Sequence, residues 1–419
     1  MPRSETADVL IVGAGAAGLA AAAFTARAAR GCRVTLLDGA RTIGAKILVS
    51  GGGRCNVTNR VVSERDFWGG AARVIRNVLR AFPAGRAVSF FAELGVVLHE
   101  EEDGKLFPNT NSARTVLDAL VREVRASGVE LCAEQRVSGI QPRDGRFIVT
   151  ASSGDSYATR VVVLATGGRS LPKSGSDGAG YDFARSLGHG YVETTPALVP
   201  LIVDDGVHKS LAGVAHPAAI TLRSDGRIRI RLEGAMLWTH FGVSGPVVLN
   251  ASRHWLRARL EGADVDVRVS VMPADTFESL EAWLLEQQRD RPRATTRSAL
   301  SSRLPASVAD AWLSIAQVDG GETLAHLSRE ARRALITALL DTPLHVRDSR
   351  GYNYAEVTAG GVPLPEIDPA TMESRVRPGL FLIGEILDVD GRLGGFNFQW
   401  AWSSAWVAAQ AIAKRMTTA

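Results

Sequence analysis

The stretch Asp8-Val-Leu-Ile-Val-Gly-Ala-Gly-Ala-Ala-Gly-Leu19 decides the fold, together with the alanine-rich run after it and the sequence Arg33-Val-Thr-Leu-Leu-Asp38. The first apolar run is short, rich in β-branched residues and closed by a glycine, which is typical of a strand buried on both faces. Residues 16–30 read as a helix, and residues 33–38 predict a second strand. The stretch therefore predicts the βαβ unit of a Rossmann-type α/β fold.

Each glycine of this stretch has its own physical task. Gly13 permits the tight turn from strand to helix, Gly15 lets a diphosphate approach the backbone, and Gly18 lets the helix pack closely on the strand. The helix N-terminus stabilises an anionic diphosphate. Asp38 follows Gly18 by about 20 residues, where an acidic side chain accepts from a ribose hydroxyl. A dinucleotide site is favoured over a glycine-rich turn in some other α/β protein.

Bulk properties bound the class of protein. A chain of 419 residues is long enough for two or three domains. The formal net charge of +4 is too small to indicate a polyanionic partner by itself. No apolar run is long enough to span a bilayer and no signal sequence is evident, so we expect a cytoplasmic protein.

Three cysteines, Cys32, Cys55 and Cys132, lie far apart in the chain and form no Cys-x-x-Cys motif. This spacing argues against a disulfide framework, a zinc site and a dithiol redox centre. We therefore expect no metal, and any redox chemistry must come from a bound cofactor.

A second glycine-rich stretch reads Ser-Gly-Gly-Gly-Arg-Cys-Asn at 50–56. Three consecutive glycines suit a loop whose backbone lies against a flat ligand, although a flexible surface loop is the alternative. Arg54 and Asn56 favour the ligand interpretation. Cys55 is either a packing residue or a thiol beside the reacting ring.

The later part of the chain contains two more predicted strands that end in glycine. A strand at 161–164 ends in Ala-Thr-Gly-Gly at 165–168, and a strand at 379–383 ends in Gly384-Glu385. A tryptophan-rich helix then begins near Gly394-Gly395-Phe396-Asn397-Phe398-Gln399. Small residues at strand ends permit close approach to a cofactor. The acid can hold a ribityl hydroxyl, and the helix N-terminus can stabilise negative charge on a reduced flavin.

Between these segments lies a region of different character. Strands are expected at 219–223, 227–232 and 265–271, and helices at 278–288, 305–316 and 328–340. Residues 236–246 are expected to form a loop that carries His240, a candidate proton donor or substrate ligand, although a hydrogen-bonded loop histidine is as good an interpretation. Earlier in the chain, residues 104–108 are also expected to form a compact loop.

Arginines concentrate in this inserted region, and Arg227, Arg229 and Arg231 share one face of a predicted strand. A row of arginines on one strand face can follow a phosphate backbone. Most charge runs are solvated surface, however. A contact with nucleic acid and an ordinary solvated surface are therefore both open interpretations of these arginines.

These stretches together resemble the BaiN/RdsA (YhiN-like) family of NAD(P)/FAD-dependent oxidoreductases. Thr-His-Phe-Gly-Val-Ser-Gly-Pro at 239–246, Glu-Val-Thr-Ala-Gly-Gly-Val at 356–362 and Gly-Glu-Ile-Leu-Asp-Val-Asp-Gly at 384–391 add to the resemblance. It implies a glutathione-reductase-like FAD domain at 1–195 and 358–419. It also implies an inserted β-barrel-like part at 196–272 and 342–357 and a helical part at 273–341.

The resemblance also implies bound FAD. The contacts carried over to this chain are Gly13, Gly15, Ala16, Gly18, Asp38, Lys46, Gly53, Arg54, Asn56, Val137, Gly167, Glu385, Asn397 and Gln399. Neighbouring residues complete the predicted cofactor set: Ala14, Cys55, Thr166, Gly384, Asp388, Gly395 and Phe396. Glu385 and Asp388 are alternative ligands of the ribityl chain.

The substrate remains open because members of the family differ in it. The leading hypothesis is reduction of a uridine C5–C6 double bond in large-subunit ribosomal RNA, with NAD(P)H as a transient hydride donor. Cys55 and His240 are the candidate catalytic proton donors. The alternatives are a small-molecule flavoenzyme, either an amine oxidase or an enone reductase, and a non-catalytic flavoprotein that binds ribosomal particles.

Overall fold

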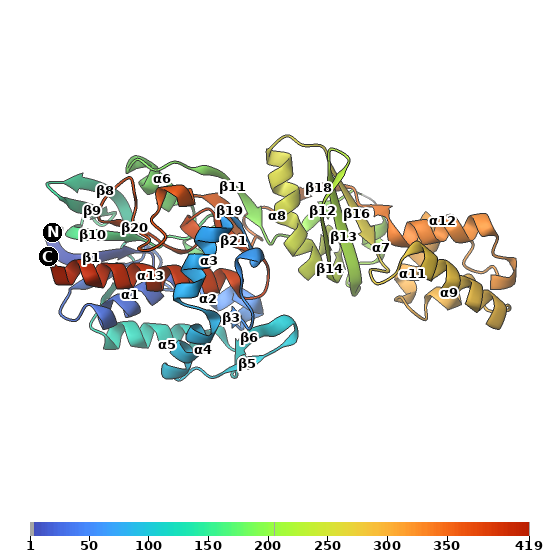
Figure 1. Cartoon of the computed structure of the whole chain (residues 1–419), viewed down its shortest axis with the longest axis horizontal. Helices are drawn as coiled ribbons and strands as arrows, with labels where there is room; N and C mark the ends of the chain where they lie inside the picture. The colour runs from blue at the N-terminus through green and yellow to red at the C-terminus, as the bar shows by residue number, and fades with distance from the viewer. Residues whose placement is uncertain (1–3, 205, 419) are drawn as a thin grey trace. The chain divides into compact units, whose positions relative to one another are not determined.

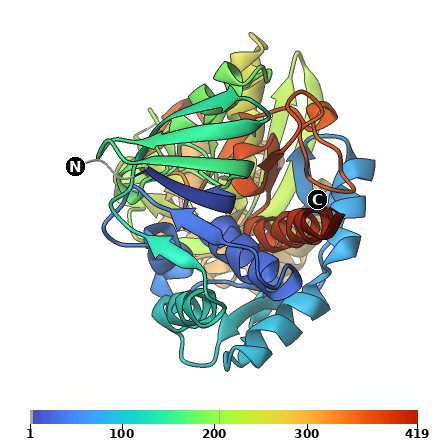
Figure 2. The same cartoon turned by 90° about the vertical axis from the view of Figure 1, so that its left-hand side faces the viewer.

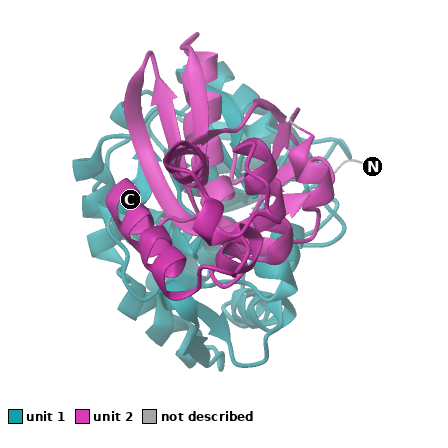
Figure 3. Ribbon diagram, turned by 90° about the vertical axis from the view of Figure 1, so that its right-hand side faces the viewer, with its two compact units in different colours: residues 1–196, 355–419 teal, residues 197–354 magenta. Residues whose placement is uncertain are grey.

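A computed structural model describes residues 4–204 and 206–418 of the chain. It divides into two compact units, of which unit 1 comprises residues 1–196 and 355–419 and unit 2 comprises residues 197–354 (Figure 3). The chain therefore leaves unit 1 once, builds unit 2, and returns to complete unit 1.

The centre of unit 1 is a seven-stranded sheet with the strand order β7-β2-β1-β10-β9-β8, in which β20 also pairs with β10. Strands β1, β2, β7, β10 and β20 run parallel, and β8 and β9 are antiparallel additions. The strands are β1 (Ser4–Val12), β2 (Val34–Leu37), β7 (Glu130–Cys132), β8 (Val137–Arg143), β9 (Arg146–Ala151), β10 (Ser156–Leu164) and β20 (Leu380–Leu382).

Helices α1 (Ala16–Ala28) and α13 (Phe396–Thr418) lie side by side on this sheet (Figure 2). The alanines of α1 bring the two backbones close together, and Phe24 fills the remaining space with its ring centroid 5.1 Å from that of Trp406. Trp400 and Trp402 are buried in this layer. The first and last segments of the chain therefore share one core.

The remaining elements of unit 1 surround this layer (Figure 1). The helices are α2 (Ala45–Val49), α3 (Ala72–Ala81), α4 (Ala84–Glu93), α5 (Ala113–Ala126) and α6 (Ala179–Ser186). The smaller strands are β3 (Thr58–Asn59), β4 (Phe67–Gly69), β5 (Leu98–Glu100), β6 (Lys105–Pro108), β11 (Val192–Ala197), β19 (Val357–Gly361) and β21 (Val389–Gly391). The expected loop at 104–108 is wrong, because residues 105–108 pair with both β3 and β5 and so form a strand.

A hydrogen-bonded trio of side chains fixes the segment that precedes β20. The Nδ1 atom of buried His189 lies 2.7 Å from Glu366, and its Nε2 atom lies 2.8 Å from the hydroxyl of Ser374. The hydroxyl of Ser374 also accepts the N–H groups of Val376 and Arg377. The trio joins the end of α6 to the loop before β20.

Unit 2 is built on an antiparallel sheet with the order β17-β16-β13-β14-β15-β12-β18. Its strands are β12 (Leu201–Val203), β13 (Ala215–Ser224), β14 (Arg227–Thr239), β15 (Gly242–Ser244), β16 (Val265–Ser270), β17 (Thr342–Pro343) and β18 (Val346–Ser349). Its helices are α7 (Val207–Ser210), α8 (Pro246–Leu260), α9 (Phe277–Asp290), α10 (Thr296–Leu300), α11 (Ala306–Ile315) and α12 (Arg329–Leu340).

The helical predictions in this unit are confirmed to within two residues. Pro305 precedes the first residue of α11, and the hydroxyl of Ser328 caps α12 by accepting the N–H of Ala331 at 3.1 Å. The expected loop at 236–246 is wrong. Trp238 pairs with Val243, so this segment is a tight hairpin whose long-range pairing the sequence did not reveal.

No helix among the described residues is long and apolar enough to cross a membrane.

Candidate dinucleotide-binding site

Two glycines, one in the turn after β1 and one in the first turn of α1, admit no side chain. Gly13 has a φ of 101°, and a Cβ atom on it would lie 2.6 Å from the carbonyl oxygen of Ala165. A Cβ atom on Gly18 would lie 1.8 Å from the carbonyl oxygen of Gly13. Strand β1, helix α1 and the end of β10 therefore meet in backbone contact, as the motif predicts.

Gly15 is different, because space beside it is open. Its φ of −80° is accessible to any residue, and no heavy atom lies within 4 Å of the position that a Cβ atom would take. The first turn of α1 has no acidic residue to neutralise its N–H groups. An open space at a helix N-terminus with this polarity fits a diphosphate.

The carboxylate of Asp38 is fixed by the main chain on both of its oxygens. Oδ2 accepts the N–H of Ala14 at 2.6 Å, and Oδ1 accepts the N–H of Ala40 at 2.7 Å. The carbonyl oxygen of Asp38 accepts the N–H of Gln135 at 2.8 Å, which brings Val137 at the start of β8 to the same edge. Each carboxylate oxygen has a second lone pair, so Asp38 can still accept from a ribose hydroxyl.

The turn after β10 carries polar groups that lack a partner. Thr166 Oγ1 and Ser176 Oγ are buried and make no hydrogen bond among the described residues. Ser176 Oγ would lie 2.9 Å from a Cβ atom on Gly167, so the two hydroxyls flank this glycine turn. Buried hydroxyls are normally hydrogen-bonded, and a ligand at this turn would satisfy them.

A polar network joins four segments that are far apart in the sequence. Lys46 Nζ lies 2.6 Å from Glu385 Oε2, and it also contacts the hydroxyl of Ser170. Glu385 Oε1 accepts from the hydroxyl of Ser170 at 2.9 Å and from the N–H of Thr358 at 2.8 Å. Gly384 precedes this glutamate in the short 3-10 helix η7 (Gly384–Ile386).

Sequence reasoning missed Ser170 and Thr358, both of which are completely buried. The one available signal was the position of Thr358 inside the Glu-Val-Thr-Ala-Gly-Gly-Val stretch. Both oxygens of Glu385 are held by protein groups. The alternative ribityl ligand, Asp388, uses its carbonyl oxygen to accept the N–H of Gly70 at 2.8 Å.

The glycine-rich loop at 50–56 forms the short turn η1 (Ser50–Gly53), in which Gly51 and Gly52 have left-handed backbone angles, followed by Arg54, Cys55 and Asn56. Arg54 donates to Glu101 at 2.7 Å and stacks over the ring of Phe107, with its Cζ atom 4.1 Å from the ring centroid. Asn56 Oδ1 accepts the N–H of Leu106. The loop is therefore held by β6 and the residues before it, which is not typical of a flexible linker.

Cys55 lies on the inner side of this loop. Its exposed fraction is 0%, and desolvation raises the pKa of its thiol to about 12, although a hydrogen bond with Ser50 opposes this shift. The thiol is therefore neutral and enclosed at physiological pH. Its surroundings are those of a packing residue.

The start of α13 uses its predicted site side chains inside the protein. The amide of fully buried Gln399 accepts from Thr58 and donates to the carbonyl oxygen of Phe82, each at 2.7 Å. The amide of Asn397 makes two hydrogen bonds to the main chain of Gly391. The side chains of both residues are therefore engaged within the protein.

Unit 2 contains the remaining candidates. His240 is exposed in the two-residue turn between β14 and β15, where its ring contacts that of Phe241. Arg229 and Arg231 are exposed on β14 but are paired with Asp225 at 3.8 Å and Glu233 at 3.3 Å. The other predicted site residues thus belong to unit 1, whereas His240 belongs to unit 2.

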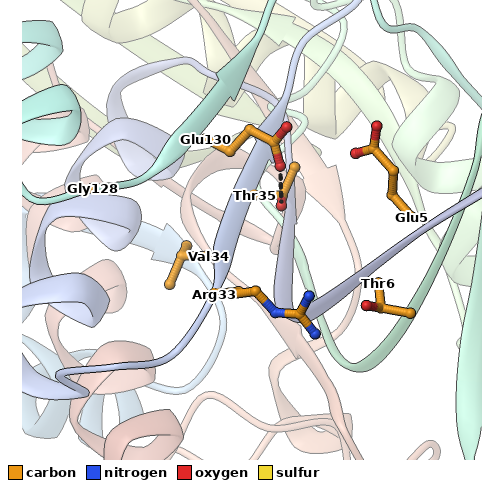
Figure 4. Close-up of a pocket in the computed structure, with 7 residues that line it drawn as sticks. All are labelled: Glu5, Thr6, Arg33, Val34, Thr35, Gly128 and Glu130. Atoms are coloured by element: carbon orange, nitrogen blue, oxygen red, sulfur yellow. Dashed lines mark hydrogen bonds between the residues drawn. The ribbon is translucent and has the colours of Figure 1, made fainter. Parts of the chain in front are cut away.

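A surface pocket lies at the other end of the parallel strands (Figure 4). Its lining residues come from the starts of β1, β2 and β7 and the segments before them: Glu5, Thr6, Arg33, Val34, Thr35, Gly128 and Glu130. Ligands of open α/β sheets bind at the carboxyl ends of the strands, where Gly13 and Asp38 lie. This pocket is therefore separate from the dinucleotide site.

The fold and the site define an FAD-dependent oxidoreductase with a Rossmann-type FAD-binding domain. The chain belongs to the family described as "HI0933-like protein Rossmann domain", whose model matches residues 7–411. The resemblance to BaiN/RdsA is thereby confirmed.

Three curated relatives match nearly the whole chain. The 3-dehydro-bile acid delta(4,6)-reductase of Clostridium scindens is 34% identical, covering 97% of this chain and 98% of the relative. The ribosomal RNA dihydrouridine synthase of Escherichia coli is 35% identical, covering 97% of this chain and 98% of the relative. The Haemophilus influenzae protein of that name is 32% identical, covering 98% and 100%.

Two solved structures share the fold at low sequence identity. A quinol-fumarate reductase with menaquinol superimposes with a TM-score of 0.51 at 16% identity, covering 99% of this chain and 72% of that chain. A 3-ketosteroid delta1-dehydrogenase from Sterolibacterium denitrificans gives 0.50 at 13% identity, covering 98% and 100%.

Proposed function

We propose that this protein uses NAD(P)H and FAD to reduce a C=C bond conjugated with a carbonyl group, and that its substrate is a uridine of large-subunit ribosomal RNA. The observation that carries the reaction type is the full-length similarity to two kinds of reductase. Dihydrouridine arises from uridine by reduction of the C5–C6 bond, and a delta(4,6) bile acid with a 3-oxo group is a conjugated dienone. Both reactions add a hydride and a proton across an activated double bond.

Bound FAD would supply the hydride, and residues of unit 1 would hold the FAD. Gly15 and the N-terminus of α1 would accept the diphosphate, and Asp38 a ribose hydroxyl. The buried hydroxyls of Thr166 and Ser176 would then gain a hydrogen-bond partner. The chain shows one dinucleotide fingerprint, which supports transient rather than resident binding of NAD(P)H.

The exposed arginines of β14 support the choice of RNA. Arg227, Arg229 and Arg231 are all exposed, but a register shift at Arg229 breaks the alternation of the strand, so the three side chains do not share one face as the sequence predicts. The acids that pair with Arg229 and Arg231 are exposed as well, and such surface ion pairs contribute about 0–1 kcal/mol. Phosphates can therefore replace these acids at low cost.

Two experiments test the RNA substrate. In an Escherichia coli strain that lacks its own ribosomal RNA dihydrouridine synthase, expression of this protein should restore dihydrouridine, measured by mass spectrometry of the ribosomal RNA. In vitro, the double variant Arg227→Ala, Arg229→Ala should lower the slope of log affinity against log salt by about 1 to 2.

The matched control carries Arg143→Ala and Arg146→Ala, two changes at the tip of the β8–β9 hairpin of unit 1. It should leave the salt slope unchanged. If the ribosomal RNA of the complemented strain still lacks dihydrouridine although the protein is expressed with bound flavin, ribosomal RNA is not its substrate.

The second candidate is a reductase of a small conjugated enone, which the Clostridium scindens relative favours. It predicts rapid, salt-insensitive reoxidation of the NAD(P)H-reduced enzyme by a 3-oxo-delta4 steroid. If the protein is instead an amine oxidase, small amines should reduce its flavin in the absence of NAD(P)H.

A further inference from the structure

We infer that a row of four planar side chains in unit 2 is a stacking site for an unpaired base of the RNA substrate. The row consists of Tyr354, Arg350, Phe241 and His240, all of which belong to unit 2. The inference rests on the proposed function, and it adds a contact with the bases of the RNA to the contact with phosphates that we assign to β14.

Each member of this stacking row contacts the next. The Cζ atom of Arg350 lies 3.5 Å from the ring centroid of Tyr354 and 4.5 Å from that of Phe241. The rings of Phe241 and His240 meet edge to face, with their centroids 5.1 Å apart. A guanidinium group is planar and stacks on aromatic faces. The four groups therefore form one continuous row.

The two ends of the stacking row are open to solvent. Tyr354 is 51% exposed, and every other Phe, Tyr or Trp residue in the described part of the chain is buried or half-buried. His240 is exposed at the other end, whereas Arg350 and Phe241 between them are half-buried. The row therefore offers an exposed ring at each end, supported by two groups that the protein partly encloses.

The charge of Arg350 is not neutralised by a direct partner. No carboxylate among residues 4–204 and 206–418 pairs with its guanidinium group. The acids of the adjoining segments are engaged, because Asp204 pairs with Arg347 at 3.3 Å and Asp348 Oδ1 accepts the N–H of Ser349 at 2.7 Å. A guanidinium group has five N–H donors. Arg350 can therefore donate to the carbonyl oxygens of a base while it stacks.

Strand β12 holds both halves of the stacking row. It pairs with β15 on one side and with β18 on the other. The carbonyl oxygen of Phe241 accepts the N–H of Val203 at 3.4 Å, and the N–H of Arg350 donates to the carbonyl oxygen of Pro200 at 3.0 Å. The turn after β14 and the end of β18 are thus fixed by the same short segment.

A tight turn returns the chain from Arg350 to Tyr354. Gly351 has a φ of 68°, and its N–H donates to the hydroxyl of Ser349 at 3.2 Å. The N–H of Tyr354 donates to the carbonyl oxygen of Gly351 at 3.1 Å. Because the main chain sets these positions before a ligand arrives, binding orders few additional groups.

The proposed reaction explains why an RNA-reducing enzyme needs such a row. The C5–C6 bond lies within the base itself, and enzymes that act on a base use single-stranded substrate or extrude the base from its stack. An unpaired base has lost neighbours, and aromatic rings and guanidinium planes replace them in RNA-binding proteins. The stacking row supplies both kinds of group.

Strand β14 links the stacking row to the arginines at its opposite end. His240 directly follows this strand, which begins at Arg227 and is 13 residues long. At a rise of about 3.3 Å per residue, such a strand spans about 40 Å. A steroid or a single nucleotide is too small to contact both ends, whereas one RNA can contact both. The arrangement therefore favours RNA over a small ligand.

The test uses the FAD-loaded full chain with Tyr354→Ala, Tyr354→Phe and Arg350→Lys. Arg333→Lys is the matched control, because Arg333 is exposed and its Cζ atom lies 5.0 Å from the ring centroid of Phe277 in the helical part of unit 2. The probe is a labelled uridine tetranucleotide, which is too short to span β14. Its affinity is measured by fluorescence anisotropy at several salt concentrations. A tetranucleotide with the same backbone but no bases is the matched ligand.

Tyr354→Ala should bind the uridine probe about 5- to 150-fold more weakly than the wild type. The slope of log affinity against log salt should not change, because no charge is lost. Arg350→Lys should also weaken binding at an unchanged slope, since it keeps the charge but loses the planar group. Tyr354→Phe and Arg333→Lys should bind like the wild type. The wild type and Tyr354→Ala should bind the probe without bases equally weakly.

Several results would overturn the inference. They are failure of the wild type to bind the uridine probe, wild-type affinity in Tyr354→Ala, and an equal loss with the probe that has no bases. If Tyr354→Ala does not fold, wild-type affinity in Arg350→Lys is decisive in the same way. Titrations of flavin bleaching with NAD(P)H exclude another source of a base. If Tyr354→Ala weakens NAD(P)H and not the uridine probe, the row holds the adenine of NAD(P)H instead of RNA.

A second measurement locates the base directly. A tetranucleotide that contains 4-thiouridine should, on irradiation, crosslink to the peptides that carry Tyr354 or His240, and crosslinks found only elsewhere would refute the assignment. If these crosslinks form but the complemented strain makes no dihydrouridine, the proposed function fails and the stacking row stands. If dihydrouridine is restored although Tyr354→Ala binds the probe like the wild type, the stacking row fails and the proposed function stands.

Discussion

Gly15→Ala should separate cofactor binding from folding. The φ of Gly15 is allowed for alanine, and the added methyl group meets no protein atom within 4 Å. It would instead occupy the space beside the N-terminus of α1 in which we place the diphosphate.

The expected magnitudes follow from this geometry. Alanine is a poorer N-cap than glycine, which lowers the free energy of unfolding by about 0.5–1 kcal/mol. Alanine also restricts the unfolded chain, which raises the free energy of unfolding by about 0.4–1 kcal/mol. The stability of the apoprotein should therefore change by less than about 0.6 kcal/mol. Loss of one charge-assisted hydrogen bond to the diphosphate costs about 1.5–3 kcal/mol, which corresponds to a roughly 10- to 150-fold weaker Kd for FAD.

The assay is a urea denaturation of the apoprotein together with a fluorescence titration with FAD. Gly85→Ala is the matched control, because Gly85 also has open space at its Cβ position but lies in α4, away from the site. That change should stabilise the helix by about 0.5–1 kcal/mol and leave the Kd unchanged. If Gly15→Ala folds normally and binds FAD with wild-type affinity, the diphosphate does not lie where we place it.

Three further outcomes are expected. Glu366→Gln removes the charged partner of buried His189 and should lower the free energy of unfolding by about 1–3 kcal/mol in urea denaturation; an unchanged midpoint would contradict the role of the trio. Cys55 should resist alkylation by iodoacetamide at pH 8 in the native protein while the partly exposed Cys32 reacts, as peptide mass spectrometry can show. Burial, and less strongly Arg253, lowers the pKa of His254 from 6.5 to about 4, so the unfolded state binds the extra proton between these values. Stability should therefore fall as the pH drops through this window, and His254→Gln should flatten the decline in a pH series of thermal melts.

Several elements were predictable because their signals are local. The turn at Gly13 requires a positive φ, and Gly18 requires the absence of a side chain, so both requirements are written in the sequence itself. Helix α12 begins where Ser328 supplies a cap. Each of these signals concerns residues within one turn of each other.

Other elements depend on pairing between distant residues. Residues 105–108 form a strand because they bond to β3 and β5, and residues 237–244 form a hairpin because Trp238 pairs with Val243. The amino-acid composition of these two segments does not reveal the strands with which they pair. The same limit applies to the arginines of β14, whose acidic partners could not be assigned from their order in the chain.

The sequence by itself determined the class of this protein, since the dinucleotide turn makes demands on backbone conformation and side-chain size that few residues can meet. Only the tertiary structure decided which polar residues of the later motifs turn inward. Gln399 and Cys55 are enclosed, whereas Glu356 is exposed between two buried neighbours, Ala355 and Val357. The physical reason is that burial and the pairing of charges depend on segments that meet only when the sheet has formed, as Lys46, Ser170 and Glu385 do.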